Sequence, residues 1–412
     1  MTFGTGSGDV ATAVATDTTG NLVVAGITLG AFPGFSNPSG SPQDFIAKFD
    51  PSGKQIWLRQ FGGGGGNNDL LNAIATDAQG NLYAGGSTEG AFPGTTNPGN
   101  TAEAVVLKFD ANGNQLWVRQ FTGGSGQGIA ALAVAPGGNV AVAGAQTLQE
   151  QQESLPSGGA LLQITAETGL IAELDGQSGS VLWQHSVAPA PITRLTGIAV
   201  DASGNIDAAG ATLASYSALP APLLAQYSPA GAAAWTVQPG GSAYAAGTVL
   251  SGVTLAANGD PVVVGCPAVS NPQTAAPGCV LAELSASDGS QVWLTPFGFP
   301  PVTPMVSGGI AVDASNNILT TGYSSEPLLS AFSASDAVYL AKFNSAGSPV
   351  WVQQFSDTST DHFNILGDVS PGGPSLAVDS EGNAYVGDNT FTTPSTPAGA
   401  SFSEPFLIKF GP

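Results

Sequence analysis

Short runs of alternating apolar and polar residues recur along the whole chain, and each run is interrupted by a turn of the type Asp-x-x-Gly-Asn. The stretch TAVATDTTGNLVVAGIT (12–28) has a near copy in NAIATDAQGNLYAGGST (72–88). Period-two alternation is typical of half-buried strands, and Asp, Gly and Asn favour turns. Each phrase therefore predicts a tight β-hairpin. Seven copies are present: VATDTTGNLVVAG, IATDAQGNLYAGG, LAVAPGGNVAVAG, IAVDASGNIDAAG, VTLAANGDPVVVG, IAVDASNNILTTG and LAVDSEGNAYVGD.

A second hairpin phrase follows each of the first six copies and ends in tryptophan. Examples are KFDPSGKQIW, KFDANGNQLW and ELDGQSGSVLW. One Trp at the same place in each repeat predicts a structural residue that packs between adjacent sheets. These are all six tryptophans of the chain: Trp57, Trp117, Trp183, Trp235, Trp293 and Trp351.

Two hairpins per repeat give four strands, and 412 residues divided among seven repeats give about 59 residues each. Four-stranded units repeated radially are the blades of a β-propeller. The sequence thus predicts an all-β fold in which residues 1–412 form one seven-bladed domain. The expected blades are residues 11–62, 70–122, 129–187, 195–239, 250–298, 307–356, and 374–412 plus 1–8.

The two ends of the chain predict how the ring closes. The seventh copy stops at PFLIKFGP, after its third strand, and FGTGSGDVATAVATD near the start parallels FGGGGGNNDLLNAIATD in the next repeat. We expect the N-terminal strand to complete the last blade, because closure hides the sheet edges.

The phrases GAFPGFSNPSG and GAFPGTTNPGN, followed by DFIAKFDPSGKQIWLRQFG and AVVLKFDANGNQLWVRQFT, resemble the bacterial SBBP-type β-propeller repeats. The resemblance is closest in the first two repeats. It implies a seven-bladed fold in a secreted or surface-attached bacterial protein, and it implies no single activity. Two repeats, AELDGQSGSVLW and AELSASDGSQVW, also resemble quinoprotein-type repeats, but the chain has few Arg and Lys residues with which to hold a quinone.

The net charge and the hydropathy of the chain restrict the classes of partner that it can bind. The chain has 29 acidic and 8 basic residues and a formal net charge of −21, which disfavours nucleic acid. No apolar run approaches the ~20 residues of a membrane helix, so we expect no membrane insertion. The start MTFGTGSGDV lacks a signal peptide pattern. With the family resemblance, the expected location is extracellular or on the bacterial cell surface.

Long, variable connections predict a binding face opposite the short hairpin turns. Loops on a rigid scaffold commonly carry binding sites. Asp9, Asp69 and Gln127 occupy the same place, eight residues before the turn, and could hold a cation or a sugar at a channel mouth; the alternative is that the two Asp side chains cap loops. The long connections are residues 28–43, 88–103, 146–169 and 356–373.

Other loop residues add candidates to this face. Phe32, Phe35 and Phe92 lie beside Pro and Gly, and their rings could stack on a ligand or pack over blade edges. Asp361 and His362 lie together in a long crossover, where a solvated loop histidine is the alternative.

Signatures of catalysis are sparse. The other histidine, His185, follows Trp183 at a position held by Arg59 and Arg119 in other repeats and is interpreted as framework. No Gly-x-Ser-x-Gly, His-Glu-x-x-His or Cys-x-x-Cys motif occurs, and the GGGGG run lacks a following Lys and helix. We predict no cofactor and no metal, with calcium left open because turns such as DSEGN are rich in Asp but lack the twelve-residue loop pattern.

The two cysteines predict a disulfide. Cys266 ends one strand of the fifth repeat and Cys279 begins the next. Antiparallel neighbours bring such positions opposite each other. The alternative is a pair of free thiols in a reducing cytoplasm.

The function expected from these patterns is non-catalytic recognition of a glycan or a protein through the long-loop face. Two alternatives stay open. One is a surface protein that assembles with copies of itself; the other is a polysaccharide lyase or hydrolase at the channel mouth, with Asp9, Asp69, Asp361 or His362 as acid and base.

Overall fold

The computed structural model describes residues 1, 3–62, 69–97, 101–121, 125–154, 160–215, 218–240, 244, 246–267, 278–298, 305–324, 337–355, 375–392 and 402–412. These residues form 27 strands and no helix, so none of them belongs to a helix that could span a membrane. The fold is all-β, as the alternation of the sequence predicts.

Most strands belong to four-stranded antiparallel sheets in which neighbours along the chain pair with each other. Four such sheets are β1 (Asp9–Thr16), β2 (Leu22–Thr28), β3 (Gln43–Phe49) and β4 (Gln55–Phe61); β5 (Asp69–Thr76), β6 (Leu82–Thr88), β7 (Glu103–Phe109) and β8 (Gln115–Gln120); β17 (Thr248–Leu255), β18 (Pro261–Pro267), β19 (Cys279–Leu284) and β20 (Gln291–Phe297); and β21 (Met305–Val312), β22 (Ile318–Ser324), β23 (Ala337–Phe343) and β24 (Pro349–Phe355).

The middle of the chain forms an eight-stranded sheet that consists of two antiparallel sets of four. A single parallel residue pair, Glu167 with Ile192, joins the two sets. The sets are β9 (Ser125–Val134), β10 (Val140–Ser154), β11 (Ala160–Leu174) and β12 (Val181–Val187), and then β13 (Ile192–Val200), β14 (Ile206–Leu213), β15 (Ala221–Tyr227) and β16 (Ala233–Val237).

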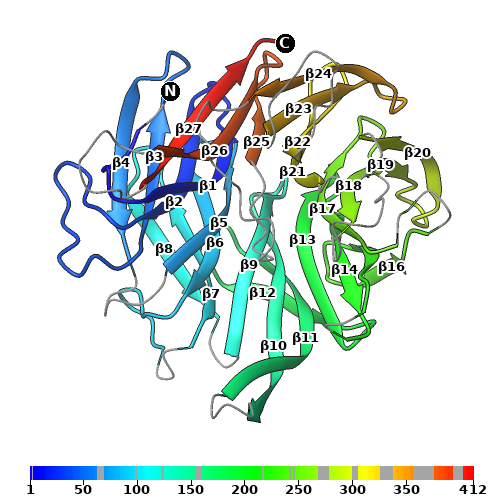
Figure 1. Ribbon diagram of the computed structural model, residues 1–412, viewed down its shortest axis with the longest axis horizontal. Coiled ribbons are helices and arrows are strands. Elements are labelled where there is room, and N and C mark those ends of the chain that lie inside the picture. The colour runs from blue at the N-terminus through cyan, green and yellow to red at the C-terminus, as the bar shows by residue number, and fades with distance from the viewer. Residues whose placement is uncertain are drawn as a thin grey trace.

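The last sheet has three strands, β25 (Ser375–Val378), β26 (Ala384–Thr392) and β27 (Phe402–Phe410). The start of the chain bonds to β27: Met1 and Leu407 exchange two backbone hydrogen bonds of 2.9 Å, and the Phe3 amide donates to Pro405 O at 3.4 Å. Figure 1 shows the sheets following one another around the molecule in chain order, with both termini on the same side.

The first strand of each sheet contacts the first strand of the next: β1 lies beside β5, β5 beside β9, and so on to β25, which contacts β1. At β-bulges in these strands, short polar side chains reach the neighbouring sheet. Thr12 Oγ1 donates to Leu71 O, Thr196 Oγ1 donates to Leu250 O at 2.6 Å, and Ser251 and Ser307 share a hydroxyl hydrogen bond.

Tryptophans of the outer strands pack on the following sheet. Trp57 Nε1 donates to Ala111 O at 3.0 Å, and its ring covers Gly113, whose φ of 77° suits the turn that it occupies. The same packing joins Trp117 to Gly179, Trp183 to Gly231, Trp235 to Gly289 and Trp293 to Gly347. Tryptophan rings that are buried (Trp57) or half-buried (the other four) therefore lie between successive sheets, against the sheet faces that form the core.

One predicted loop is mostly strand. Residues 146–169 were expected to be a long irregular connection, but β10 runs to Ser154 and β11 begins at Ala160, and the two pair along almost their whole length with a register shift near Gln149. The ribbon is anchored at its base, because Glu167 Oε2 accepts from Arg194 Nε at 2.8 Å and the Glu167 amide donates to Pro191 O.

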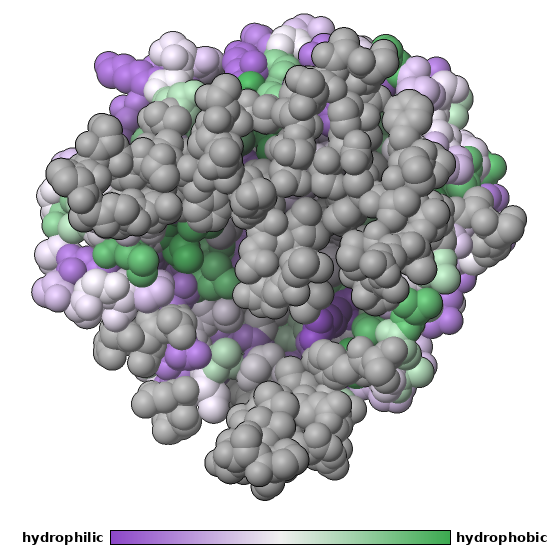
Figure 2. Space-filling model, in the orientation of Figure 1, coloured by the Kyte–Doolittle hydropathy of each residue, from purple (hydrophilic) through white to green (hydrophobic). Residues whose placement is uncertain are grey.

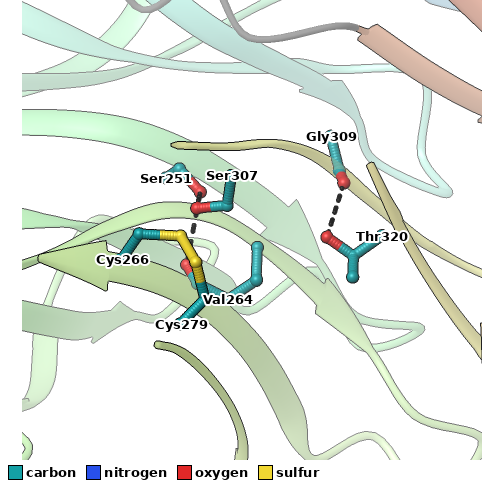
Figure 3. Close-up of a disulfide and its surroundings, with 7 residues drawn as sticks. All are labelled: Ser251, Val264, Cys266, Cys279, Ser307, Gly309 and Thr320. Carbon is teal, nitrogen blue, oxygen red and sulfur yellow. Dashed lines mark hydrogen bonds between the residues drawn. A yellow bond between two sulfur atoms is a disulfide. The ribbon is translucent and has the colours of Figure 1, made fainter. Parts of the chain in front are cut away.

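The structure contains the predicted disulfide between Cys266, in β18, and Cys279, in β19, with 4.1 Å between the Cα atoms (Figure 3).

Replacing both cysteines by serine is expected to lower the free energy of unfolding by about 2–3 kcal/mol, since the bridge closes a short loop in the unfolded chain. Denaturant unfolding with and without a reducing agent measures this. A reductant that destabilised the double variant as much as the parent would contradict the assignment.

Candidate functional site

The predicted channel-mouth residues lie at the start of the first strand of successive sheets and are buried. Asp9, Asp69 and Gln127 are 0%, 4% and 5% exposed. Asp9 accepts hydrogen bonds from the Thr5 amide (2.5 Å) and hydroxyl (3.0 Å), and Asp69 accepts one from Thr88 Oγ1 (2.5 Å). In this structure the two carboxylates hold neighbouring segments in place, which is the loop-capping alternative.

Two long loops on the same face have the same internal design. In loop A (residues 29–42), Gln60 Nε2 donates to Gly30 O at 2.9 Å and Gln60 Oε1 accepts from the Phe32 amide at 2.8 Å. In loop B (residues 89–102, described except 98–100), Gln120 Nε2 donates to Gly90 O at 2.8 Å. Side-chain bonds from the outer strand thus fix the entry of both loops.

A second contact closes each loop. Asn37 Nδ2 donates to Ser41 O and Asn97 Nδ2 to Thr101 O, each at 2.8 Å. Because the same asparagine does this in both loops, the repeated phrase of the sequence encodes side-chain hydrogen bonds at both the entry and the exit of each loop. A rigid loop loses little conformational entropy on binding, which favours recognition.

Two of the three loop phenylalanines, Phe32 and Phe92, pack inward, which is the packing alternative, whereas Phe35 is exposed. Phe32 is 4% exposed and packs edge-on against Phe45 at 5.3 Å between ring centroids; Phe92 is 2% exposed and packs near Phe61. They anchor loops A and B to the sheets. Loop A exposes the third candidate, Phe35, and also Leu29, which are 36% and 44% exposed.

Of the remaining histidine and aspartate positions, one packs within the fold and two lie outside the described residues. His185 stacks with both Trp183 (5.3 Å between centroids) and Tyr227 (6.0 Å), which also stack with each other at 6.1 Å, and this cluster belongs to the framework. Asp361 and His362 lie outside the described residues. Figure 2 shows polar and apolar residues interspersed over the described part of one face.

Carboxylates of the hairpin turns also form ion pairs that stabilise the fold. Asp17 pairs with Lys48 at 2.8 Å and Asp313 with Lys342 at 3.0 Å, and all four side chains are largely buried. Burial alone would raise the pKa of Asp17, but the Lys48 ammonium and the Asn21 amide lower it below its usual value. Among the described residues, no group of three His, Cys, Asp or Glu is placed to hold a metal ion.

Two buried carboxyl groups were not singled out from the sequence. Asp44 is fully buried, and one oxygen accepts from the Leu71 amide at 3.1 Å while Oδ2 has no hydrogen-bond partner among the described residues. Burial, and then the nearby Asp69, raise the pKa of Asp44 well above its usual value. Alignment of the repeats would have revealed it, because Ala104, Gly169 and Pro222 stand at the same position.

Asp207 is the second such group. It lies on β14, is fully buried and accepts one hydrogen bond, from Gln226 Nε2 at 3.1 Å. Burial raises its pKa to about 7; the Gln226 bond opposes this, and Asp201 and Asp260 add to it. Other repeats place Val23, Ala141 or Val262 here.

A family model matches one short part of the chain. Residues 56–93 match the family model described as a beta-propeller repeat, SBBP. No curated protein matches the chain.

Similar solved structures share the fold at low identity. The WD40 repeats of RRP9 are 11% identical, with 97% of this chain and 94% of that chain covered and a TM-score of 0.55. A puromycin hydrolase mutant is 13% identical (98% and 52% covered, TM-score 0.53), and an acylaminoacyl peptidase from Pyrococcus horikoshii is 9% identical (97% and 51% covered, TM-score 0.50). This chain thus matches about half of each enzyme. At these identities the likeness shows a β-propeller fold and nothing of activity; the protein is a β-propeller protein that carries an SBBP-type repeat at residues 56–93.

Proposed function

We propose that the chain is one domain, a seven-bladed ring in which the N-terminal residues complete the last blade. The hydrogen bonds between Met1 and Leu407 support this, as does the contact between β1 and β25. Met1 also lies over Gly53, with its sulfur 3.4 Å from where a Cβ would stand. Trp57 covers Gly113 in the same way on the next sheet, so Met1 takes the place of the missing tryptophan.

On this ring, the function we propose is non-catalytic binding of a glycan or a protein through the long-loop face, outside the cell or on its surface. The observation that carries the proposal is the matched pair of preorganised loops, A and B, of which loop A exposes Leu29 and Phe35. Rigid loops with an exposed aromatic ring are suited to recognition. The disulfide is compatible with an extracellular location.

The test is binding of the purified protein to a broad glycan array, with and without calcium, followed by substitution of Phe35. Phe35→Ala is expected to weaken binding about tenfold with little change in stability, since the ring is exposed and an aromatic contact contributes on the order of 1–2 kcal/mol. Isothermal titration with the glycan found on the array measures the loss.

Val292→Ala is the matched control, because Val292 is also exposed but lies on β20, away from loops A and B. It should leave binding unchanged. Equal losses in both variants, or binding that is indifferent to Phe35, would contradict the role of loop A. Absence of any glycan ligand together with concentration-dependent association would favour self-assembly.

A further inference from the structure

A cavity of about 370 Å³ opens at the hairpin-turn end of the molecule, at the opposite end of the strands from loops A and B. It lies between the ends of β13, β17 and β21. Its apolar walls include Val200, Leu255 and Val312, and its polar lining consists of Thr254, Asp313 and Asn316. This volume is within the range of small-ligand pockets.

The cavity lies where hydroxyl hydrogen bonds that are found elsewhere at this level are missing. At the position before the turn, Thr76 Oγ1 donates to Thr16 O (2.8 Å) and Thr16 Oγ1 donates to Val378 O (3.1 Å), which joins the ends of β5, β1 and β25. Val200, Leu255 and Val312 stand at the same position and have no hydroxyl group. The ends of β13, β17 and β21 therefore lack these hydroxyl bonds and leave an apolar gap.

One side of the rim is fixed by an unusual residue. Asn316 has a φ of 60°, the only positive value among the described non-glycine residues, at a turn position that is glycine in the other six repeats. Its Oδ1 accepts from the Ala257 amide at 2.8 Å and so joins two turns across the rim.

The charge around the cavity favours a positively charged ligand. Besides Asp207, whose pKa burial raises to about 7, residues 193–298 carry four carboxyl groups (Asp201, Asp260, Glu283 and Asp288) but one basic side chain, Arg194, which is paired with Glu167. Asp313 in the lining is paired with Lys342. The surplus of carboxylates gives this mouth a negative potential, which attracts cations and repels anions.

We propose that this cavity binds a lysine side chain presented by a partner protein. Lysine combines a four-carbon apolar stem with a charged end, so the stem packs against Val200, Leu255 and Val312 while the ammonium group stays at the polar rim. The site is separate from the long-loop face, and the outcome of the glycan experiment does not bear on it.

The probe is Nα-acetyl-lysine N-methylamide, titrated into deuterated, ¹⁵N-labelled protein and followed by transverse-relaxation-optimised NMR. We expect saturable shifts of the Ala257 and Asn316 amide signals that weaken several-fold between 50 and 500 mM salt. The norleucine analogue keeps the stem without the charge, and the Nε-acetyl analogue keeps the length; both should shift these signals at least tenfold less. Equal shifts with either analogue, or no localised shift with lysine, would overturn the proposal.

Val312→Phe should fill the cavity and abolish the lysine-induced shifts. Val134→Phe is the matched control, because Val134 stands at the same repeat position on β9 and does not line the cavity. Each variant is used only if its unfolding midpoint matches that of the parent. The comparison of lysine with its analogues needs no variant and decides the proposal alone if Val312→Phe fails to fold.

Discussion

Replacing Gly86 by alanine is expected to lower the free energy of unfolding by about 3–5 kcal/mol, which is on the order of half of the stability of an ordinary domain. Gly86 lies on β6 opposite the bulge of β5. A Cβ there would overlap the carbonyl oxygen of Leu70 and stand 2.8 Å from the Cα of Leu71. Both obstacles are backbone, so no rotamer change relieves them and the two strands must separate.

Guanidinium unfolding, followed by tryptophan fluorescence, measures this loss. Gly137→Ala is the control, because a Cβ at Gly137 meets no atom within 4 Å; its effect should stay within about 0.5 kcal/mol. The same overlap with the neighbouring strand is found at Gly26, Gly144 and Gly210. A change below about 1 kcal/mol for Gly86→Ala would show that the pairing of β5 with β6 is looser than described.

The hairpin units could be predicted from the sequence because their signals are local. In each Asp-x-x-Gly-Asn turn the side chain of the Asp accepts bonds from residues two and four positions later, as Asp77 does from the Gln79 and Asn81 amides at 3.0 and 2.9 Å. Alternation then fixes which side chains are buried. The disulfide was predicted for the same reason, since Cys266 and Cys279 flank one connection.

The local sequence left two directions open for the loop phenylalanines, exposed for stacking or packed over the blade edges. Phe32 and Phe92 lie among Pro and Gly residues, which describe a turn but not the side on which a ring packs. The deciding contacts come from residues far along the chain, namely Gln60, whose side chain fixes the Phe32 amide, and Phe45, against which the Phe32 ring packs. The ribbon at residues 146–169 was missed for a related reason, since its Gln- and Glu-rich strand lacks apolar alternation and is held by backbone pairing.

The buried carboxyl groups show a different limit of prediction from the sequence. Asp207 lies within NIDAAG, which otherwise follows the repeat pattern, and only a position-by-position alignment of the repeats shows that Asp replaces an apolar residue. Its environment depends on the absence of a cation: the position that holds Lys48, Lys108 or Lys342 in other repeats is Gln226 here. A buried carboxyl group without a cationic partner keeps its proton, which makes the stability of this sheet depend on pH.

Asp207→Asn is therefore expected to stabilise the protein above neutral pH and to have little effect in acid. The pKa of Asp207 is raised to about 7 in the folded protein, mainly by burial, and is near 3.9 in the unfolded chain. The favourable contribution of the protonated group is complete below the unfolded value and is lost as pH rises from about 4 through about 7. The loss amounts to about 4 kcal/mol at pH 8, since each pKa unit corresponds to ~1.4 kcal/mol.

Urea unfolding of the parent and of Asp207→Asn between pH 4 and 8 measures the difference in free energy. Asparagine matches the shape of the protonated carboxyl group and keeps the oxygen that accepts from Gln226 Nε2, so the difference should be near zero at pH 4 and grow with pH. Asp17→Asn provides a comparison of opposite sign, because the pKa of Asp17 is lowered beside Lys48 and its favourable contribution is lost in acid. A difference for Asp207→Asn that is the same at every pH would mean that the carboxyl group is ionised throughout this range, and that packing rather than proton binding determines its effect.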